Sequence, residues 1–206
     1  MPIAIEFKDI QKIYGEKSLY GQLSGCIEAG RCTAITGNNG SGKSTFLKII
    51  AGLLRPSAGT VRYRDAAKLL PLEQIRGQIA FAAPDMQLYS ALTAAENLRF
   101  FAAMAATPLS AAEIADLLQN VHLAGEAAKP LGSFSTGMKQ RLKLALLPAV
   151  KRSIWLLDEP SSNLDEAGRS IVGALIRQAR SEQRTVLLAT NDPAEVAYAD
   201  TIFRLS

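Results

Sequence analysis

One stretch of the sequence constrains the fold more than any other: residues 37–45, which read Gly-Asn-Asn-Gly-Ser-Gly-Lys-Ser-Thr. They fit the pattern G-x-x-x-x-G-K-[ST], in which backbone N–H groups converge on phosphate oxygens at the positive end of a helix. Residues 31–36 before the motif predict a buried strand. The hydrophobic side chains behind it repeat at helical spacing: Phe46, Ile49, Ile50, Leu53 and Leu54. A flexible glycine turn without a ligand would not need these flanks, so the sequence predicts a nucleotide-binding loop.

Two side chains of this loop are expected to carry specific chemistry. Lys43 would reach the β- and γ-phosphates, and the hydroxyl of Ser44 would hold Mg²⁺. The loop residues expected to contact the nucleotide are Asn38, Asn39, Gly40, Ser41, Gly42, Lys43, Ser44 and Thr45.

The composition is that of an ordinary globular protein, with 206 residues, 48% hydrophobic and 20% charged, and a formal net charge of +4. This length fits one large domain or a domain with a lobe. Residues 139–152 contain five basic residues and no acidic one: Lys139, Arg141, Lys143, Lys151 and Arg152. No aromatic side chain is interleaved with them to stack on bases. We therefore interpret this run as a solvated helix face and expect no nucleic acid partner.

Cys26 and Cys32 are the only cysteines, and the chain has one histidine, so no zinc framework is indicated. We expect both thiols to point into a core. Residues 1–6 lack the basic start and apolar segment of a signal peptide. No apolar run approaches the ~20 residues that span a bilayer. The expected location is the cytoplasm, with any membrane attachment made through a partner.

Hydrophobic patterning divides the chain into three segments. The first, 1–84, predicts the short strands 3–7, 19–27, 31–36, 60–63 and 79–82, which suggests an antiparallel sheet beside a parallel one. The second, 85–150, is largely helical, and two of its helices open on the capping boxes Thr93–Glu96 and Ser110–Glu113. In the third, 151–206, strands alternate with helices, which is typical of a parallel α/β sheet.

Several polar or aromatic residues lie at the ends of these predicted strands. Tyr14 lies 23 residues before Gly37 and could stack on an adenine ring or pack as an ordinary loop aromatic. The apolar strand 153–157 ends in Asp158 and Glu159, where a phosphate-loop enzyme places a metal-site carboxylate. Near the C-terminus, Asp192 is expected to cap a helix that has Pro193 at its first position and Glu195 completing a capping box. Residues 202–205 predict a last edge strand.

Residues 134–141 read Phe-Ser-Thr-Gly-Met-Lys-Gln-Arg and precede Asp158 by 23 residues, counted from Ser135. This signature, the phosphate loop, and the run from Leu157-Asp158-Glu159-Pro160 to Ser162-Asn163-Leu164-Asp165 resemble the ATPase family of ABC transporters over essentially the whole chain. The resemblance implies an α/β P-loop NTPase fold with a RecA-like parallel sheet core. Residues 1–84 and 151–206 would form this core with an N-terminal antiparallel β subdomain, and 85–150 would form a helical subdomain that carries the signature.

The resemblance also implies a role for each matching residue. Tyr14 would stack on adenine, Ser44 and Asp158 would hold Mg²⁺, and Glu159 would polarise the attacking water as the general base. The active unit would be a head-to-tail dimer with two ATP molecules between the subunits, made of two copies of this chain or of one copy and a close relative. The residues of the second subunit that would close over the γ-phosphate are Ser135, Thr136 and Gly137. Asp165 would lie in a loop at that interface.

Three positions depart from the family pattern. Pro84 stands where the family has a glutamine near the metal and the transmembrane partner, and Gln87 is wrongly spaced to replace it. Asn191 stands in place of the family's switch histidine, and its amide can donate a hydrogen bond to the γ-phosphate but carries no charge. Pro148 is expected to end or kink the helix behind the signature. Since losing one transition-state contact costs ~10²–10³ in turnover, we expect slow hydrolysis that depends on Glu159.

The chain ends after its last predicted strand, so we expect a separate ATPase subunit that works with transmembrane permease subunits. The signature is similar to that of antibiotic and sodium exporters, and residues 93–100 are similar to the ATPase of the haem exporter used in cytochrome c maturation, which favours export over import. Two alternatives stay open: a non-transport ABC ATPase acting on DNA or ribosomes, and a degenerate regulatory nucleotide sensor. The sequence does not identify the transported substrate.

Overall fold

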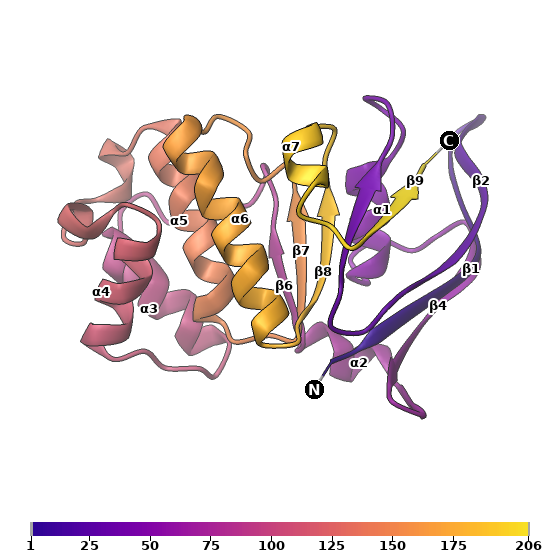
Figure 1. The fold of residues 1–206 in the computed structure, drawn as a ribbon, viewed down its shortest axis with the longest axis horizontal. Coiled ribbons are helices and arrows are strands. Elements are labelled where there is room, and N and C mark those ends of the chain that lie inside the picture. Colours follow the sequence, from indigo (N-terminus) through magenta and orange to yellow (C-terminus); the bar gives the residue numbers. More distant parts are fainter. Residues whose placement is uncertain (1, 206) are drawn as a thin grey trace.

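Strands that are hydrophobic along their whole length form the centre of the molecule. In the computed structural model, which describes residues 2–205, β7 (Ile154–Asp158) and β8 (Thr185–Ala189) are buried at every position. Burial on both faces is typical of parallel strands covered by helices. The two strands belong to a parallel sheet of order β6-β7-β8-β3-β9 (Figure 1). Its other members are β6 (Ile79–Ala82), β3 (Cys32–Thr36) and the edge strand β9 (Thr201–Arg204). The predicted parallel α/β core is confirmed.

A second, antiparallel sheet of order β2-β1-β4-β5 lies on the right-hand side of Figure 1. Its long strands are β1 (Ala4–Tyr14), β2 (Lys17–Ile27) and β4 (Ala58–Asp65). Side chains of β1 alternate between buried and exposed from residue 4 to residue 8, as the sequence pattern predicts. The short edge strand β5 (Lys68–Leu70) was not predicted, because three residues are too few to show a period.

The longer helices begin where their capping residues predict. α3 (Ala94–Met104) and α4 (Ala111–Asn120) both open on complete capping boxes, at Thr93 and Ser110. α5 (Thr136–Ala149) begins after Ser135, whose hydroxyl accepts a hydrogen bond from the N–H of Met138. It ends one residue after Pro148, in agreement with the predicted end near this proline. α6 (Glu166–Ser181) begins after Asp165, whose carboxylate accepts from the N–H of Gly168.

Five shorter helices complete the chain. α1 (Lys43–Ile50) follows the phosphate loop, and α2 (Leu72–Arg76) and α7 (Pro193–Val196) are each one turn long. Two 3₁₀ turns, η1 (Ala124–Glu126) and η2 (Leu131–Ser133), lie between α4 and α5. None of the helices in residues 2–205 has both the length and the hydropathy that crossing a bilayer requires.

Two hydrophobic clusters cover the two faces of the parallel sheet. Trp155 and Leu157 of β7 belong to a cluster that also contains side chains of α3, α4, α5 and α6. Ile154 and Leu156 of the same strand point into the other cluster, with side chains of α1 and of the antiparallel sheet. The alternation of side chains along a strand therefore divides one apolar run between two cores. The helices of residues 94–149 share the first cluster with the sheet and with α6.

Two local predictions were wrong because tertiary contacts or a glycine intervened. The helix after the phosphate loop does not continue to Leu53 and Leu54; it ends at Ile50, because Gly52 adopts a φ of +68° and the N–H of Leu53 turns back to the carbonyl of Lys48. Glu195 does not complete a capping box at Asp192. Its carboxylate is buried and accepts from the N–H of Ser161 at 3.0 Å instead.

The basic run and one cysteine also differ from expectation. Cys32 is buried as predicted, but Cys26 is exposed. The basic run does not form a uniformly solvated face, because Arg141 and Arg152 are half-buried while Lys151 is exposed. Arg141 pairs with Asp165 and Lys151 pairs with Glu113. Arg152 donates to the carbonyl of Ala105, and Lys143 donates to the carbonyl of Pro84. Four of the five basic side chains of this run, all but Lys139, thus bond to groups of other segments of the chain.

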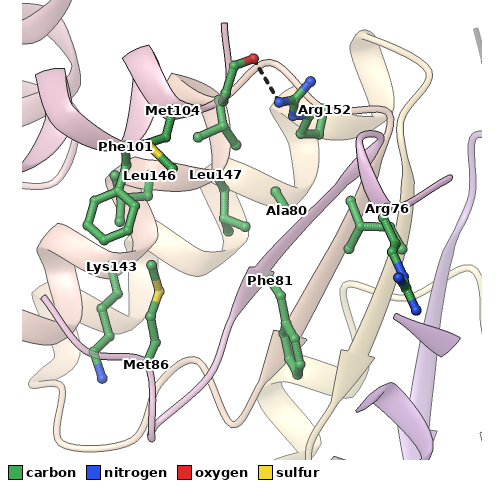
Figure 2. Close-up of a pocket in the computed structure, with 13 residues that line it drawn as sticks. Arg76, Ala80, Phe81, Met86, Phe101, Met104, Lys143, Leu146, Leu147 and Arg152 are labelled. Carbon is green, nitrogen blue, oxygen red and sulfur yellow. Dashed lines mark hydrogen bonds between the residues drawn. The ribbon is translucent and has the colours of Figure 1, made fainter. Parts of the chain in front are cut away.

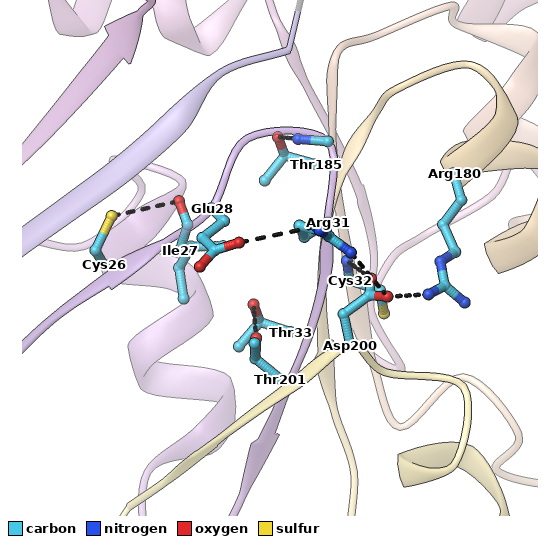
Figure 3. A network of polar contacts seen from close by, with 11 residues as sticks. Cys26, Ile27, Glu28, Arg31, Cys32, Thr33, Arg180, Thr185, Asp200 and Thr201 are labelled. Carbon is cyan, nitrogen blue, oxygen red and sulfur yellow. Dashed lines mark hydrogen bonds and ion pairs between the residues drawn. The ribbon is translucent and has the colours of Figure 1, made fainter.

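Asp200 links β3, α6 and the start of β9 at the end of the sheet where β3 begins (Figure 3). Its carboxylate accepts from the N–H of Cys32 at 2.8 Å and pairs with the guanidinium groups of Arg180 and Arg31. Only 8% of the Asp200 side chain is exposed. Because a buried carboxylate needs such partners, this network fixes the edge strand against the helix layer.

Candidate active site

The phosphate loop lies between β3 and α1, and its shape depends on Gly42. This residue precedes α1 with a φ of +92°. A Cβ atom placed there would lie 2.6 Å from Cδ2 of Leu19 and 2.7 Å from Cε1 of Tyr20. Only glycine accepts both this backbone conformation and this close approach. The loop therefore packs directly on β2, and the N-terminus of α1 is left open to an anion.

Lys43 is held over the loop by the loop's own backbone. Only 5% of Lys43 is exposed, and its ammonium donates to the carbonyl oxygens of Gly37 at 3.0 Å and Asn38 at 3.4 Å. Phosphate oxygens form stronger, charge-assisted hydrogen bonds than carbonyls, so they can replace these partners. The hydroxyl oxygen of Ser41 is buried and has no partner among the described residues. The loop thus has the donors that a phosphate group needs.

Tyr14 lies at the mouth of an open pocket of about 390 Å³ in front of the loop. Its side chain is exposed, with 52% of the residue accessible, and the ammonium of Lys12 lies 4.9 Å from the ring centroid. An exposed aromatic ring beside a phosphate site offers a flat surface on which a base can stack. The other residues that line this pocket are Leu19, Asn39, Gly40, Gly42, Lys43, Ser44, Thr45 and Glu159.

Asp158 ends β7 beside the phosphate loop and is 2% exposed. Its Oδ1 is buried without a hydrogen-bond partner among the described residues. Burial raises the pKa of Asp158; the nearby hydroxyl of Ser44 opposes this rise, Glu159 and Asp85 add to it, and Lys48 lowers it again. A divalent cation held by Ser44 and Asp158 would satisfy the orphaned oxygen and stabilise the buried charge. These two residues therefore fit Mg²⁺.

Glu159 directly follows Asp158 and is exposed to the pocket. Its backbone has a φ of +45°, which is unfavourable for a residue with a side chain, and its N–H donates to the carbonyl of Ala189 at 2.9 Å. Residues held in this way are often found at functional sites. Glu159 and Asn39 also line an adjoining pocket of about 290 Å³, together with Ser161, Ser162, Arg169, Thr190, Asn191, Asp192 and Glu195.

Asn191 lies after β8 and faces the phosphate loop. Its Nδ2 donates to Oδ1 of Asn39 at 2.8 Å, and both residues are exposed. The structure thus brings Asn191 to the site where the resemblance places it. This bond uses one of the two N–H donors of its amide.

The signature residues Ser135, Thr136 and Gly137 do not line either pocket around the phosphate loop. They lie at the N-terminus of α5, where Ser135 and Thr136 are exposed. Within one chain, the candidate site is therefore built from the loop, Tyr14, Asp158, Glu159 and Asn191, and the signature lies outside it.

Two polar side chains, Gln140 and Glu195, connect α5 and α7 to the segment after Glu159, a role that the sequence did not predict for either. Gln140 is buried and donates to the carbonyl of Pro160 at 2.9 Å. Glu195 accepts from the N–H of Ser161, as described above. Both residues hold backbone next to Glu159, and the only signal in the sequence is a polar residue on the buried face of a helix.

The segment after β6 also holds charged residues near the site. Pro84 and Gln87 are exposed, and the amide of Gln87 donates to the carbonyl of Asp85 rather than to any group of the site. Asp85 pairs with Lys48 of α1 at 2.8 Å. The hydrogen bond from Lys48 lowers the pKa of Asp85.

A separate cavity of about 250 Å³ opens between β6, α3 and α5 (Figure 2). Figure 2 shows the side chains of Phe101, Met104 and Leu147 around it, with Lys143 and Arg152 at its borders. Met104 is 74% exposed. The ring of Phe101 packs on those of Phe100 and Tyr89, which are both exposed.

The fold and the site define a P-loop NTPase, a nucleotide-binding protein with a parallel sheet core. The family model described as "ABC transporter" matches residues 20–162. The chain belongs to the ABC transporter family and is an ATP-binding domain of it.

Similar proteins cover nearly the whole chain. It is 33% identical over 189 residues to the cytochrome c biogenesis ATP-binding export protein CcmA of Brucella abortus, covering 92% of this chain and 86% of that one. The CcmA of Pseudomonas aeruginosa is 31% identical over 198 residues, covering 96% and 98% of the two chains.

Solved structures agree with this assignment. A putative ABC transporter ATP-binding protein of Pyrococcus furiosus matches with a TM-score of 0.86 and 27% identity, over 98% of this chain and 97% of the other. A dimeric ATP-binding cassette in a post-hydrolysis state, bound to ADP and Pi, matches with a TM-score of 0.85 and 26% identity, over 98% and 94%.

Proposed function

We propose that this chain binds ATP with Mg²⁺ and hydrolyses it as the ATPase subunit of an ABC exporter. The observation that carries this proposal is one continuous pocket region in which Tyr14, the phosphate loop and Glu159 face one another, beside a buried Asp158 with an orphaned oxygen. Adenine would stack on Tyr14, and the β- and γ-phosphates would take the donors of Lys43 and of the loop. Mg²⁺ held by Ser44 and Asp158 neutralises phosphate charge when it is bound.

Glu159 is the residue in this site that can accept the proton of an attacking water. Its carboxylate is exposed to the pocket, and its backbone is held by Ala189, so it can reach a water in line with the γ-phosphate without a large movement. Asn191 donates one N–H to Asn39 and could offer the other to the γ-phosphate, but its amide adds no charge. This arrangement supports slow turnover rather than fast turnover.

Steady-state ATP hydrolysis by the purified chain tests the role of Glu159. We expect Glu159→Gln to lower kcat at least 10²-fold while ATP still binds, because the amide cannot accept the proton. Glu73→Gln on the exposed face of α2 is the matched control and should hydrolyse ATP as wild type does. Equal turnover by Glu159→Gln and wild type would contradict the assignment. Nucleotide binding by a wild-type protein that does not hydrolyse ATP would favour a regulatory sensor.

We further propose that two such subunits, either two copies of this chain or this chain and a close relative, close head to tail. The support is that Ser135 and Thr136 are exposed at the N-terminus of a 14-residue helix, and that neither they nor Gly137 line the phosphate site of their own chain. Glu159→Gln should elute as a dimer in size-exclusion chromatography with Mg-ATP. Addition of Ser135→Arg should return it to the monomer, because the arginine side chain would occupy the space for the second subunit's nucleotide.

The cavity of Figure 2 supports a membrane-embedded partner, and we propose that it receives an amphipathic cytoplasmic segment of the permease. The cavity wall is apolar and continues into the exposed Met104 and Phe100. Lys143 and Arg152 at its border bond to backbone carbonyls rather than to carboxylates, so their charge favours an acidic residue on the partner. The chain would then lie at the cytoplasmic face of the membrane, held by its partner.

Affinity purification from detergent-solubilised membranes tests this surface. The wild-type chain should retain a multi-span membrane protein, and Met104→Glu should lose it while ATP hydrolysis by the isolated chain stays unchanged.

Since the relatives named above are cytochrome c biogenesis export proteins, we propose that this chain is the ATPase subunit of a haem exporter. Retention of a ribosome or of DNA in place of a membrane protein would contradict transport.

A further inference from the structure

Asp85 lies beside the candidate metal site because of the register of the parallel sheet. β6 pairs with β7 so that Ala82 lies opposite Leu157. Ala83, the first residue after β6, therefore lies next to Asp158, the last residue of β7. Asp85 comes two residues later at the same edge.

The partner of Asp85 belongs to the same helix face as Ser44. Lys48 lies four residues after Ser44 on α1, which places both side chains on one face of the helix. The Nζ of Lys48 is 2.8 Å from Oδ2 of Asp85. The Asp85 side chain is 66% exposed and that of Lys48 is 37% exposed, so the pair contributes little to the stability of the fold.

The backbone of this segment is held in place from its other side. Lys143 of α5 donates to the carbonyl of Pro84 at 2.6 Å and to that of Ala83 at 3.3 Å. The charged groups near Asp85 are therefore Lys48, Lys143 and Asp158. Asp85 and Lys48 carry opposite charges at the edge of the sheet where Asp158 lies, so they act in opposite directions on a cation held there.

We propose that Asp85 is a positioning residue for the nucleotide-bound cation: it adds a negative charge at the edge of the Ser44–Asp158 site, and the paired ammonium of Lys48 offsets part of that charge. This inference rests on the proposed function and deepens it. Asp85 then raises the affinity of the site for a divalent cation, and Lys48 lowers it.

Binding of Mn²⁺ in the presence of ATP, measured from the electron paramagnetic resonance signal of free Mn²⁺, tests the proposal. The measurement is made in the Glu159→Gln protein, so that no hydrolysis occurs. Asp85→Asn should weaken Mn²⁺ binding about fivefold, because it removes a nearby negative charge. Lys48→Gln should tighten binding by a similar factor. The double variant should bind as its parent does, and Asp116→Asn on α4 is the control for the loss of an exposed carboxylate.

The opposite directions separate this role from a purely structural one. If the ion pair only holds the segment after β6, both single variants break it, and both should change Mn²⁺ affinity in the same direction. That result, or an unchanged affinity for Asp85→Asn, would overturn the inference while leaving the proposed ATPase function intact. A parent protein that binds no Mn²⁺ with ATP would instead count against the proposed function itself.

Discussion

Asn191 shows how one side chain sets what the site can do. It lies where the family resemblance places a histidine, and it is bonded to Asn39 of the phosphate loop. An amide in this place can donate a hydrogen bond to phosphate as well as to Asn39, but it cannot develop positive charge as phosphate charge builds up in the transition state.

Asn191→His is therefore expected to raise kcat about tenfold or more, with a small change in the KM for ATP, because the imidazole can add charge to the transition state. Asn191→Ala is the matched variant and should lower kcat. Steady-state kinetics of the purified protein checks both. Turnover by Asn191→His at or below the wild-type value would show that the site has adapted to the amide.

At the scale of single elements, capping residues explain most of the helix boundaries. The capping boxes at Thr93 and Ser110 were predicted from four-residue patterns and are confirmed, because both partners of a box lie within one turn. Ser110 and Glu113 also connect α4 to another element, since Glu113 pairs with Lys151 after α5.

The hydrogen bond from the N–H of Ser110, together with that from Lys151, lowers the pKa of Glu113 to about 2. A lowered pKa means that the ionised form stabilises the folded state, and that this stabilisation is lost as the pH falls from about 4.5 towards 2. Glu113→Gln should therefore lower the Tm at pH 7, and the difference from wild type should disappear near pH 2. Thermal unfolding followed by circular dichroism between these pH values checks this.

Asp116→Asn on the same helix is the control, and its Tm difference from wild type should not depend on pH in this way. A Glu113→Gln difference that persists at pH 2 would show that the side chain acts through packing rather than through its charge.

At the scale of the whole molecule, Asp200 connects segments that are far apart in the chain. Its carboxylate accepts a hydrogen bond from the N–H of Cys32 and pairs with the guanidinium groups of Arg31 and Arg180 (Figure 3).

Asp200→Asn should lower the free energy of unfolding by about 2–3 kcal/mol, because the amide leaves Arg180 without its carboxylate partner. Urea unfolding measures the change. Glu28→Gln, which affects only the exposed pair with Arg31, is the control and should change stability by less than about 1 kcal/mol.

Features that depend on residues close together in the sequence could be predicted without the structure. The phosphate loop, the capping boxes and the apolar strands 153–157 and 185–189 depend on neighbours within a few positions, so their patterns are sufficient. The site residues were predicted by matching motifs, and the structure shows which of these residues lie close together. The loop, Tyr14, Asp158, Glu159 and Asn191 surround one region, whereas Ser135–Gly137 lie outside it.

Other features depended on tertiary contacts between distant residues, for which a single sequence has no signal. Glu195 accepts from Ser161 rather than capping its own helix, and Asp85 pairs with Lys48 across the end of the sheet. Arg141 and Lys151 each pair with a carboxylate of another segment. Each of these side chains could also have satisfied its hydrogen bonds locally or in water. The sequence alone determined a nucleotide-binding α/β chain with this phosphate loop, because local sterics and hydrophobic period are enough for that. Only the tertiary structure decided which charges surround the loop, because that depends on which strands become neighbours in the sheet.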